Sequence, residues 1–531
     1  MTPRPGLVLE VDRSTPPILF HHGEGFRLER LPAGRSRVLY PPEALPGLAR
    51  PDLAIRDALE NPLDCEPLSA LLRPGMRLTI AFDDLSLPLP PMKRPDVRQR
   101  VIEAVLDLAA AAGVDDVHII AALALHRRMT EAELRHAVGD RVYDAFAPAG
   151  LLYNHDAEDA ENMVVLGATP HGETVQMSRR AAESDLLVYV NINIVAMDGG
   201  WKSTATGLSG YAGVRHHHNV RTMQASRSFM DQERSELHAS NWRQGHVIRT
   251  HGPRVFQVET TINTNTFGTD GPLSFLQKRE WEWSGADRAK FIGMQAGLKR
   301  MPASARRQIF QSWRAPYALT GVAAGEVEAV HRATTERVYR QHLVAVEGQT
   351  DILTMGLPYI CPYNVNSIMN PILVMCLGLG YFFNLYRGRP PVREGGVVIL
   401  SHPTPWEFHP IHHPSYIDFF EQVLADTTDP IEIEARYEKA YAEDEWYRHL
   451  YRTSYAYHGV HPFYMWYWGA HALAHVGRVI IVGGDPRAVR RLGFHPATTL
   501  DDALEMATDV VGRAPTITHL HNPPILMADV S

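Results

Sequence analysis

The chain has 531 residues, of which 45% are hydrophobic and 21% are charged. This composition is typical of a globular protein, and the length allows two or three domains. The formal net charge of −8 argues against a nucleic acid or an anionic membrane as partner, because such partners favour basic patches. The expected ligand is therefore a small molecule.

Cysteine content and hydropathy narrow the class of protein further. Cys65, Cys361 and Cys376 are too few and too scattered for a disulfide framework or a thiolate metal site. The N-terminal residues lack the basic-then-apolar pattern of a secretory signal. The most apolar stretch, residues 371–386, is shorter than the ~20 residues that a membrane-spanning helix needs, and it is typical of a buried core element. We expect a soluble, cytoplasmic protein.

Strands and helices alternate from residue 77 onward. Buried strands are predicted over RLTIAFDD (77–84), VHIIAALAL (117–125) and LLVYVNINI (186–194). Asp96 is placed to cap a helix that stops at Gly113, and Thr130 and Glu133 form a T-x-x-E capping box. This alternation predicts a mainly parallel sheet, with ligand groups beyond the carboxyl ends of its strands.

A second alternation resumes after a less regular, Trp-rich middle segment. We therefore predict an α/β protein of two domains, each with a mainly parallel sheet flanked by helices, and a cleft between them. Residues 1–333 would form the N-terminal domain, with an elaboration near 234–316. Residues 334–510 would form the C-terminal domain, and 511–531 a tail able to return to the N-terminal one.

The most informative motif is Asp198-Gly-Gly-Trp-Lys-Ser203, followed by three histidines at 216–218. A Gly-rich turn after a buried strand can present backbone amides to an anion, with a lysine beside them. It is not a Walker loop, because the G-x-x-x-x-G-K-[ST] spacing is absent. Histidines can hold a metal, but consecutive side chains point in different directions, so one or two would reach one ion. Surface or interdomain histidines are the alternative.

This stretch resembles the lactate racemase family, whose members carry a Gly-Gly-x-Lys-Ser turn, then a Tyr, then a His at a fixed distance. The matching residues are Gly199, Gly200, Lys202, Ser203, Tyr211 and His218. The resemblance implies that Lys202 is covalently joined to a pyridinium nucleotide bearing two sulfurs. It also implies that His218 is the protein's ligand to the nickel of this nickel-pincer nucleotide, with Gly199, Gly200 and Tyr211 in the cofactor site of the N-terminal domain.

Other segments extend the resemblance from about residue 77 to residue 509. Residues 84–90 are similar to the family's Asp-x-Thr-Arg-Pro-x-Pro loop, and residues 125–130 to its Leu/Phe-His-Arg-Pro-x-Thr segment. By this resemblance His126 is the catalytic acid/base. Asp84 and Ser86 would bind the cofactor, or Asp84 would orient neighbouring polar groups, a part that Asp83 could also take.

The family interconverts stereoisomers of 2-hydroxy acids by moving a hydride to and from its cofactor, while a base takes the hydroxyl proton. Histidine suits that proton transfer because its unperturbed pKa of about 6.5 lies near working pH. The resemblance therefore implies an isomerase, a racemase or epimerase of a small hydroxy acid. The enzymes that make the cofactor are its implied partners.

Three departures from the family bear on activity. The segment before the Gly-Gly turn lacks the family's second catalytic histidine, and its polar residues are Asn191, Asn193 and Asp198. Leu87 replaces the arginine of the Asp-x-Thr-Arg-Pro loop. The family's substrate-contacting lysine has no counterpart, since no lysine lies between Lys299 and Lys439. A two-base racemase that loses one base should lose ~10²–10⁴ in rate unless another group replaces it.

Several groups are candidates for the missing ones. His402, His409, His412 and His413 follow a buried strand, and Lys93 or Arg94 would restore a positive charge. The aromatic run at 455–468 favours a packed core helix over a cleft lining. The favoured function is a racemase or epimerase of a 2-hydroxy acid other than lactate. The alternatives are a one-way hydride-transfer enzyme or redox isomerase that needs only His126, and a zinc-binding protein that is not a racemase.

Overall fold

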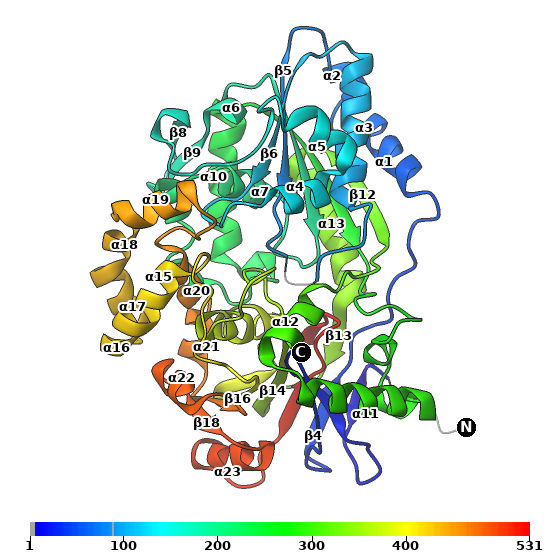
Figure 1. Ribbon diagram of the computed structural model, residues 1–531, viewed down its shortest axis with the longest axis vertical. Coiled ribbons are helices and arrows are strands. Elements are labelled where there is room, and N and C mark those ends of the chain that lie inside the picture. The colour runs from blue at the N-terminus through cyan, green and yellow to red at the C-terminus, as the bar shows by residue number, and fades with distance from the viewer. Residues whose placement is uncertain (1–5, 88–89) are drawn as a thin grey trace.

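The computed structural model describes residues 6–87 and 90–531. Two large sheets organise the chain, one of six strands in the upper half of Figure 1 and one of nine strands in the lower half. The α/β class with mainly parallel sheets is therefore confirmed. Among the described residues, no helix has both the length and the apolar character needed to cross a bilayer.

The six-stranded sheet has the order β12-β11-β10-β5-β6-β7. Its strands are β5 (Arg77–Asp83), β6 (Asp116–Ala122), β7 (Leu152–Asn154), β10 (Leu186–Asn193), β11 (Arg254–Ile262) and β12 (Leu319–Gly325). All neighbours are parallel except β11 and β12. The three strands predicted at 77–84, 117–125 and 186–194 are confirmed as β5, β6 and β10, the centre of this sheet.

Helices cover both faces of the six-stranded sheet. The helices of this half of the molecule are α1 (Pro51–Glu60), α2 (Leu68–Leu71), α3 (Val97–Ala111), α4 (Glu131–Val138), α5 (Asp140–Phe146), α6 (Arg179–Ala182), α7 (Trp201–Gly207), α8 (Tyr211–Val214), α9 (Val220–Ala225), α10 (Glu236–His251) and α13 (Val327–His342), with the turns η1 (Ala160–Asn162) and η2 (Gln232–Arg234). Ile80 and Phe82 of β5 share a core with Val101 of α3. Tyr189 of β10 shares another with Trp201 of α7.

The predicted helix starts are confirmed by their caps. The Asp96 carboxylate accepts a hydrogen bond from the backbone N–H of Arg98 at the start of α3. Thr130 and Glu133 form a complete capping box at the start of α4. Each cap satisfies backbone donors that a helix leaves unpaired in its first turn.

The nine-stranded sheet has the order β1-β4-β19-β14-β16-β17-β18, and β2 joins β14 to β3. Its strands are β1 (Val8–Glu10), β2 (Ile18–Gly23), β3 (Phe26–Glu29), β4 (Ser36–Leu39), β14 (Thr350–Pro358), β16 (Val392–Ser401), β17 (Arg478–Val482), β18 (His495–Ala497) and β19 (Ile517–Leu520). Two smaller sheets complete the set: β13 (Leu343–Val346), β20 (Met527–Val530) and β15 (Tyr386–Gly388), and the hairpin β8 (Met163–Ala168) with β9 (Thr174–Ser178).

Helices of the second half flank this sheet and build a lobe on the left of Figure 1. They are α14 (Pro371–Met375), α15 (Pro414–Asp418), α16 (Leu424–Asp426), α17 (Pro430–Ile433), α18 (Lys439–Glu443), α19 (Glu445–Thr453), α20 (His461–Tyr467), α21 (Ala470–His475), α22 (Pro486–Arg491) and α23 (Leu500–Val511), with the π-helical segments η5 (Cys376–Phe382), η6 (Phe419–Val423) and η7 (Glu434–Glu438). Every residue of α14, η5 and α20 is buried. The apolar stretch at 371–386 and the aromatic run therefore contribute core helices, as expected.

The division of the chain between the two large sheets does not follow the predicted domain boundary at residue 333. β1 and β4 pair in the nine-stranded sheet, not in the sheet of the N-terminal domain. The C-terminal strand β19 also lies there, between β4 and β14. The tail therefore completes the sheet of the second half. Pairing between strands several hundred residues apart leaves no local pattern in a sequence.

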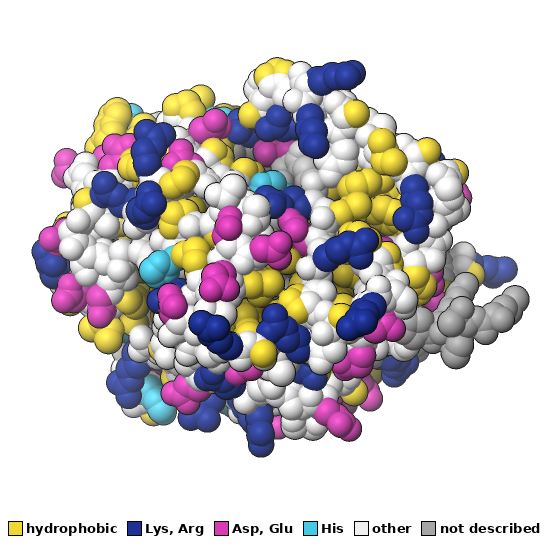
Figure 2. Space-filling view, turned by 90° about the horizontal axis from the view of Figure 1, so that it is seen from below, with side chains coloured by type: hydrophobic (Ala, Val, Ile, Leu, Met, Phe, Trp, Pro, Cys, Tyr) yellow, Lys and Arg dark blue, Asp and Glu magenta, His cyan; other side chains and the backbone are white. Residues whose placement is uncertain are grey.

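The predicted elaboration at 234–316 is likewise shared between the two halves of the molecule. Its first part contains α10 and β11, which are integral to the six-stranded sheet. The remainder forms η3 (Ser274–Gln277), η4 (Glu280–Glu282), α11 (Gly285–Arg300) and α12 (Ala303–Gln311). This remainder packs in one core with Leu19, Phe26 and Tyr359, which belong to the half of the molecule built on the nine-stranded sheet. Basic and acidic side chains are interspersed over the described part of the face in Figure 2.

One buried carboxylate joins four segments, distant in the sequence, of the half of the molecule that is built on the nine-stranded sheet. Glu280 of η4 is 3% exposed. It accepts hydrogen bonds from the backbone N–H of Leu19 at 2.9 Å and from the Tyr40 hydroxyl at 2.6 Å. It also shares one with Nε2 of His521 at 2.8 Å. The segment that contains η4, two N-terminal segments and the C-terminal tail thus meet at the Glu280 side chain.

Replacing Glu280 with alanine should destabilise the fold by roughly 3 kcal/mol, because its buried partners lose their common acceptor. Urea denaturation followed by circular dichroism measures the loss. Glu347→Ala, at an exposed glutamate, is the control and should change little. Equal midpoints for the two variants would contradict the assigned role of Glu280.

Candidate active site

The carboxyl ends of β5, β6 and β10 open onto one cavity. Its lining includes Asp83, Asp84, Ser86, Leu87, His126, Asn191, Asp198, Gly199, Lys202, His218, Tyr363, Tyr381 and Trp468. Parallel strands end at the same edge of a sheet, which brings these residues together. The predicted site residues Asp84, Ser86, His126, Gly199, Lys202 and His218 therefore lie around a single cavity. Pro88 and Leu89 of the predicted 84–90 loop lie outside the described residues.

Asp84 and His126 form a hydrogen-bonded pair on this cavity. Nδ1 of His126 lies 2.9 Å from Oδ2 of Asp84. Ser86 donates to the same carboxylate from its backbone N–H at 2.9 Å and from its hydroxyl at 3.0 Å. Burial alone would raise the pKa of Asp84, but His126 and the Ser86 bonds outweigh it, so the pKa is lowered. Asp84 is therefore an ionised group that orients the imidazole.

The neighbouring carboxyl of Asp83 has a different environment. Burial raises its pKa to about 7, although its Oδ2 accepts the backbone N–H of Ile192 at 2.8 Å. Arg98 donates to the backbone carbonyls of Asp83 at 2.8 Å and Asp84 at 2.5 Å. The guanidinium thus fixes the end of β5, from which both carboxyls reach the cavity.

The Gly-Gly turn is held by a buried carboxylate that sequence reasoning missed. Glu259 of β11 is fully buried and accepts the backbone N–H of Gly200 at 2.6 Å. It also accepts Nδ2 of Asn193 at 2.8 Å and lies 3.2 Å from Nδ1 of His331. The signal available in the sequence was a glutamate in the middle of RVFQVETTI (254–262), which forms a buried strand. The Gly200 amide, expected to meet an anionic ligand, meets this protein carboxylate instead.

The turn leads directly to Lys202, on the first turn of α7. Its Nζ lies 3.8 Å from Oδ1 of Asp198, and the side chain is 23% exposed. Lys202 is the single Lys or Arg among the described residues that line the cavity. Lys202 therefore supplies the cationic side chain of the described lining.

His218 lies on the same cavity, beneath Tyr464 and Trp468. Its ring centroid is 5.4 Å from that of Tyr464 and 5.6 Å from that of Trp468. Burial lowers its pKa well below the ordinary value, and the nearby His217 and Lys202 lower it further. The imidazole is therefore neutral at neutral pH, and its Nδ1 is buried without a hydrogen-bond partner among the described residues.

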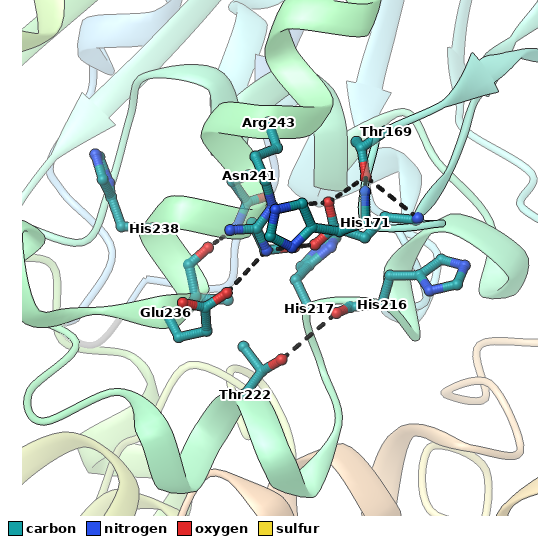
Figure 3. A network of polar contacts seen from close by, with 12 residues as sticks. Thr169, His171, His216, His217, Thr222, Glu236, His238, Asn241 and Arg243 are labelled. Carbon is teal, nitrogen blue, oxygen red and sulfur yellow. Dashed lines mark hydrogen bonds and ion pairs between the residues drawn. The ribbon is translucent and has the colours of Figure 1, made fainter.

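The adjacent histidines have other roles. Both ring nitrogens of His217 are engaged, Nε2 with the Thr206 hydroxyl at 2.9 Å and Nδ1 with Nε2 of Gln244 at 3.1 Å. In Figure 3 its ring reaches toward Asn241 and Arg243 of α10, and that of His216 points to the other side. Arg243 is itself bound to Glu173 at 2.6 Å. His217 therefore anchors the segment, and of the three adjacent histidines His218 is the one that lines the cavity.

Two predicted cofactor residues lie elsewhere. Gly200 is absent from the lining, since its amide faces Glu259. Tyr211 also lies outside the lining, and its hydroxyl donates to Oε1 of Glu438 at 3.0 Å. Tyr467 donates to Oε2 of the same carboxyl at 3.1 Å. Tyr211 thus joins the N-terminal half to the helical lobe.

None of the suggested replacement groups is among the described residues that line the cavity. His409 stacks on His412 at 3.8 Å, His412 is bound to the Ser367 hydroxyl at 2.9 Å, and His413 lies 3.3 Å from Nδ2 of Asn370. His402 bonds the backbone N–H of Thr404 at 2.9 Å. Arg94 pairs with Asp140 at 2.9 Å. Lys93, too, lies off the lining.

The second half contributes groups that sequence reasoning did not single out. Tyr363, Tyr381 and Trp468 line the cavity, and the two tyrosine hydroxyls are 2.8 Å apart. His461 packs against His126, with ring centroids 5.2 Å apart. The cavity is therefore closed by residues far along the chain. Trp468 ends the aromatic run at 455–468, which we expected to pack in the core, and no pattern pointed to Tyr363 or Tyr381.

Comparison with known proteins identifies the family that part of the chain matches. Residues 23–231 match the family described as the lactate racemase N-terminal domain, and this segment contains both Lys202 and His218. Residues 23–231 therefore form a divergent lactate racemase N-terminal domain. The family resemblance predicted from the motifs is thus confirmed.

The individual relatives are distant. The lactate racemase of Thermoanaerobacterium thermosaccharolyticum is 24% identical over 210 residues, which cover 35% of this chain and 46% of that protein. That of Lactiplantibacillus plantarum is 25% identical over 169 residues, which cover 31% and 38%. The chain thus spans less than half the length of these curated relatives. The structure of the lactate racemase apoprotein from T. thermosaccharolyticum has the same fold, with a TM-score of 0.63 and 17% identity over 96% of this chain and 99% of that one.

The Gly-Gly turn gives a direct test of the local packing. Gly200 has φ +59°, and a Cβ there would lie 2.8 Å from the His331 ring. Gly200→Ala should therefore cost more than about 3 kcal/mol of stability, the sum of strain and overpacking. Gly34→Ala is the matched control, because Gly34 has φ +76° but open space around it, and it should cost only about 1–2 kcal/mol. Equal thermal midpoints for the two variants would contradict the close packing.

Glu438 makes stability depend on pH. Burial and then Glu434 raise its pKa from 4.5 to about 7, against the lowering effect of the two tyrosine hydrogen bonds. Folding therefore favours the protonated form, and this group weakens the fold progressively as pH rises from about 4.5 to 7. Glu438→Gln removes the effect, so its stability relative to the parent should grow by roughly 3 kcal/mol over that range.

Urea denaturation of both proteins at pH 4.5 and pH 8 measures this change. Glu443→Gln, at an exposed carboxyl on the next helix, is the control. A difference between parent and Glu438→Gln that stays constant with pH would show that the carboxyl is not held in this state.

Proposed function

We propose that the protein is a racemase or epimerase of a 2-hydroxy acid other than lactate, working with a nickel-pincer nucleotide held by Lys202 and His218. His126 is the acid/base. The observation that carries the proposal is the convergence of the Asp84–His126 pair, Lys202 and His218 on one cavity inside a lactate racemase N-terminal domain.

The residues present fit that cofactor. A metal ligand must offer an unprotonated nitrogen, and burial keeps His218 neutral while its Nδ1 has no partner among the described residues. No group of three or more His, Cys, Asp or Glu side chains able to hold a metal occurs in the described part of the chain. His218 would thus act as a single protein ligand, and Lys202 would carry the nucleotide covalently.

When bound, the cofactor would supply the acceptor and donor of the substrate's hydride. The chain's own part is proton transfer. With Nδ1–H of His126 donated to the ionised Asp84, Nε2 is the nitrogen free to accept the hydroxyl proton of the substrate. The same carboxylate stabilises the imidazolium that results.

The cavity also bears on the substrate. Leu87 supplies no charge at the place of the family's arginine, and Lys202 would be consumed by the tether. Neutral donors remain for the substrate's oxygens. They are the Trp468 indole N–H, which is buried and has no hydrogen-bond partner in the described part of the chain, and the hydroxyls of Tyr363 and Tyr381. This supports a substrate that is larger or less anionic than lactate.

Co-expression with the cofactor-making enzymes tests the proposal. Intact-protein mass should show an adduct on the parent protein and none on Lys202→Arg. Metal analysis should show bound nickel in the parent, and the nickel content of His218→Ala should be at least tenfold lower. His216→Ala is the matched control and should keep both, because His216 does not line the cavity. A screen of 2-hydroxy acids for loss of optical rotation then identifies the substrate.

Three outcomes distinguish the alternatives. Nickel with unmodified Lys202 would contradict the tether, and zinc without an adduct would support the zinc-binding protein. Exchange of substrate deuterium without inversion would support one-way hydride transfer with His126 as the single base.

A further inference from the structure

We propose that Asp198 is the second acid/base of this cavity and serves the side of the substrate opposite His126. The inference rests on the proposed function and goes beyond it, since it names the group that takes the part for which the 186–200 segment holds no histidine.

The sheet places the two groups on opposite flanks. Asp198 follows β10 and His126 follows β6, and β5 lies between these strands. Neighbouring strands are about 4.8 Å apart, so the strands that lead to the two groups, β10 and β6, lie about 10 Å apart. Both line the cavity, with Asp83 and Asp84 of the β5 end between them.

Inversion needs proton transfer at two places. Hydride and proton leave the secondary alcohol to give a planar ketone. For hydride to return to the other face, the ketone must turn over, which moves its oxygen to the other side of the cavity. A base that received the first proton is then out of reach of the oxygen that must be protonated. Two groups on opposite flanks meet this requirement.

The Asp198 carboxyl is held in a fixed position. Its Oδ2 accepts the backbone N–H groups of Ile194 and Val195, each at 3.2 Å. Its Oδ1 lies 3.8 Å from Nζ of Lys202, and the side chain is 15% exposed. One oxygen is therefore anchored by the turn, and the other lies on the cavity beside the amine that would bear the cofactor.

Its surroundings suit a group that both takes and gives a proton. Burial raises its pKa, the Lys202 cation and the two amides lower it, and Glu259 raises it, with a net rise. Asp83 and Tyr381 are the other titratable groups that interact with it. Once Lys202 is joined to the cofactor it is no longer a cation, and the pKa of Asp198 rises further. A carboxyl so placed is able to take a proton from the substrate and to return it.

The competing groups do not meet the same requirements. Asn191 and Asn193 cannot accept a proton, because an amide is not a base in this range. His461 packs on His126 and shares a hydrogen bond with the Tyr416 hydroxyl at 2.6 Å, which places it on the His126 side. Asp198 is therefore the ionisable side chain of the β10 flank that reaches the cavity beside Lys202.

The step is balanced. In one direction the substrate O–H bond breaks and its proton passes to the Asp198 carboxylate, while the cofactor, when bound, would accept the carbinol hydrogen with its electron pair. In the return, the ketone regains hydride on its other face and receives a proton from protonated His126. The opposite enantiomer uses the two groups in the reverse order.

Asp198→Asn in co-expressed protein tests the inference. The Lys202 adduct, read by intact mass, and the nickel content should match the parent, because the amide keeps the two backbone hydrogen bonds. Racemisation should fall ~10²–10⁴-fold. In a single turnover quenched with acid, keto acid should still form from one enantiomer and be lost from the other, and His126→Ala should show the reverse preference.

Two controls separate chemistry from structure. Asp185→Asn changes an aspartate at the other end of β10, which accepts the backbone N–H of Arg77 at 2.8 Å, and should leave mass, nickel and rate unchanged. Asp198→Glu keeps a carboxyl and should restore more than a tenth of the rate.

A parental rate in Asp198→Asn, equal loss of keto acid from both enantiomers, or loss of the adduct would each overturn the role of Asp198. Failure of the proposed function looks different, since the parent itself would then lack the adduct or turn over no hydroxy acid.

Discussion

The site depends on one buried carboxylate. Glu259 accepts the Gly200 amide, the Asn193 side chain and an interaction from His331, and so fixes the turn that connects β10 to α7. Left unpaired in the interior, these groups would cost several kcal/mol. Asp198 and Lys202 lie on either side of this turn, so their approach to the cavity follows from it. The two glycines are needed because a Cβ at either position would collide with Glu259 or His331.

The parallel sheet brings the other groups of the site to the same cavity. Three adjacent strand ends contribute Asp84, His126 and Asp198, and the second half closes the cavity with aromatic rings. Low exposure acts differently on each group. It keeps His218 neutral, raises the pKa of Asp83 and Asp198, and strengthens the pairing of Asp84 with His126. One environment thus holds a neutral imidazole, an imidazole oriented by an ionised carboxylate, and carboxyls whose pKa is raised.

The parts of this arrangement that the sequence predicts are those with local patterns. β5, β6 and β10 are apolar runs, and the caps at Asp96 and Thr130 are short-range signals, so all were found. The shared cavity of Lys202 and His218 followed from motif resemblance. Long-range features were missed: the pairing of β1 and β4 with the C-terminal tail, the role of Glu259, and the closing tyrosines. Tyr211 matched the motif but lies against Glu438, because side-chain direction is not encoded in spacing.

The most direct test of the central claim is anomalous diffraction at the nickel edge from crystals of the co-expressed protein. The account predicts a nickel peak in the cavity beside the His218 ring, with electron density continuous from the metal-bearing nucleotide to the Lys202 side chain. A nickel peak bound elsewhere, or a Lys202 amine that ends free beside a loaded cavity, would contradict it.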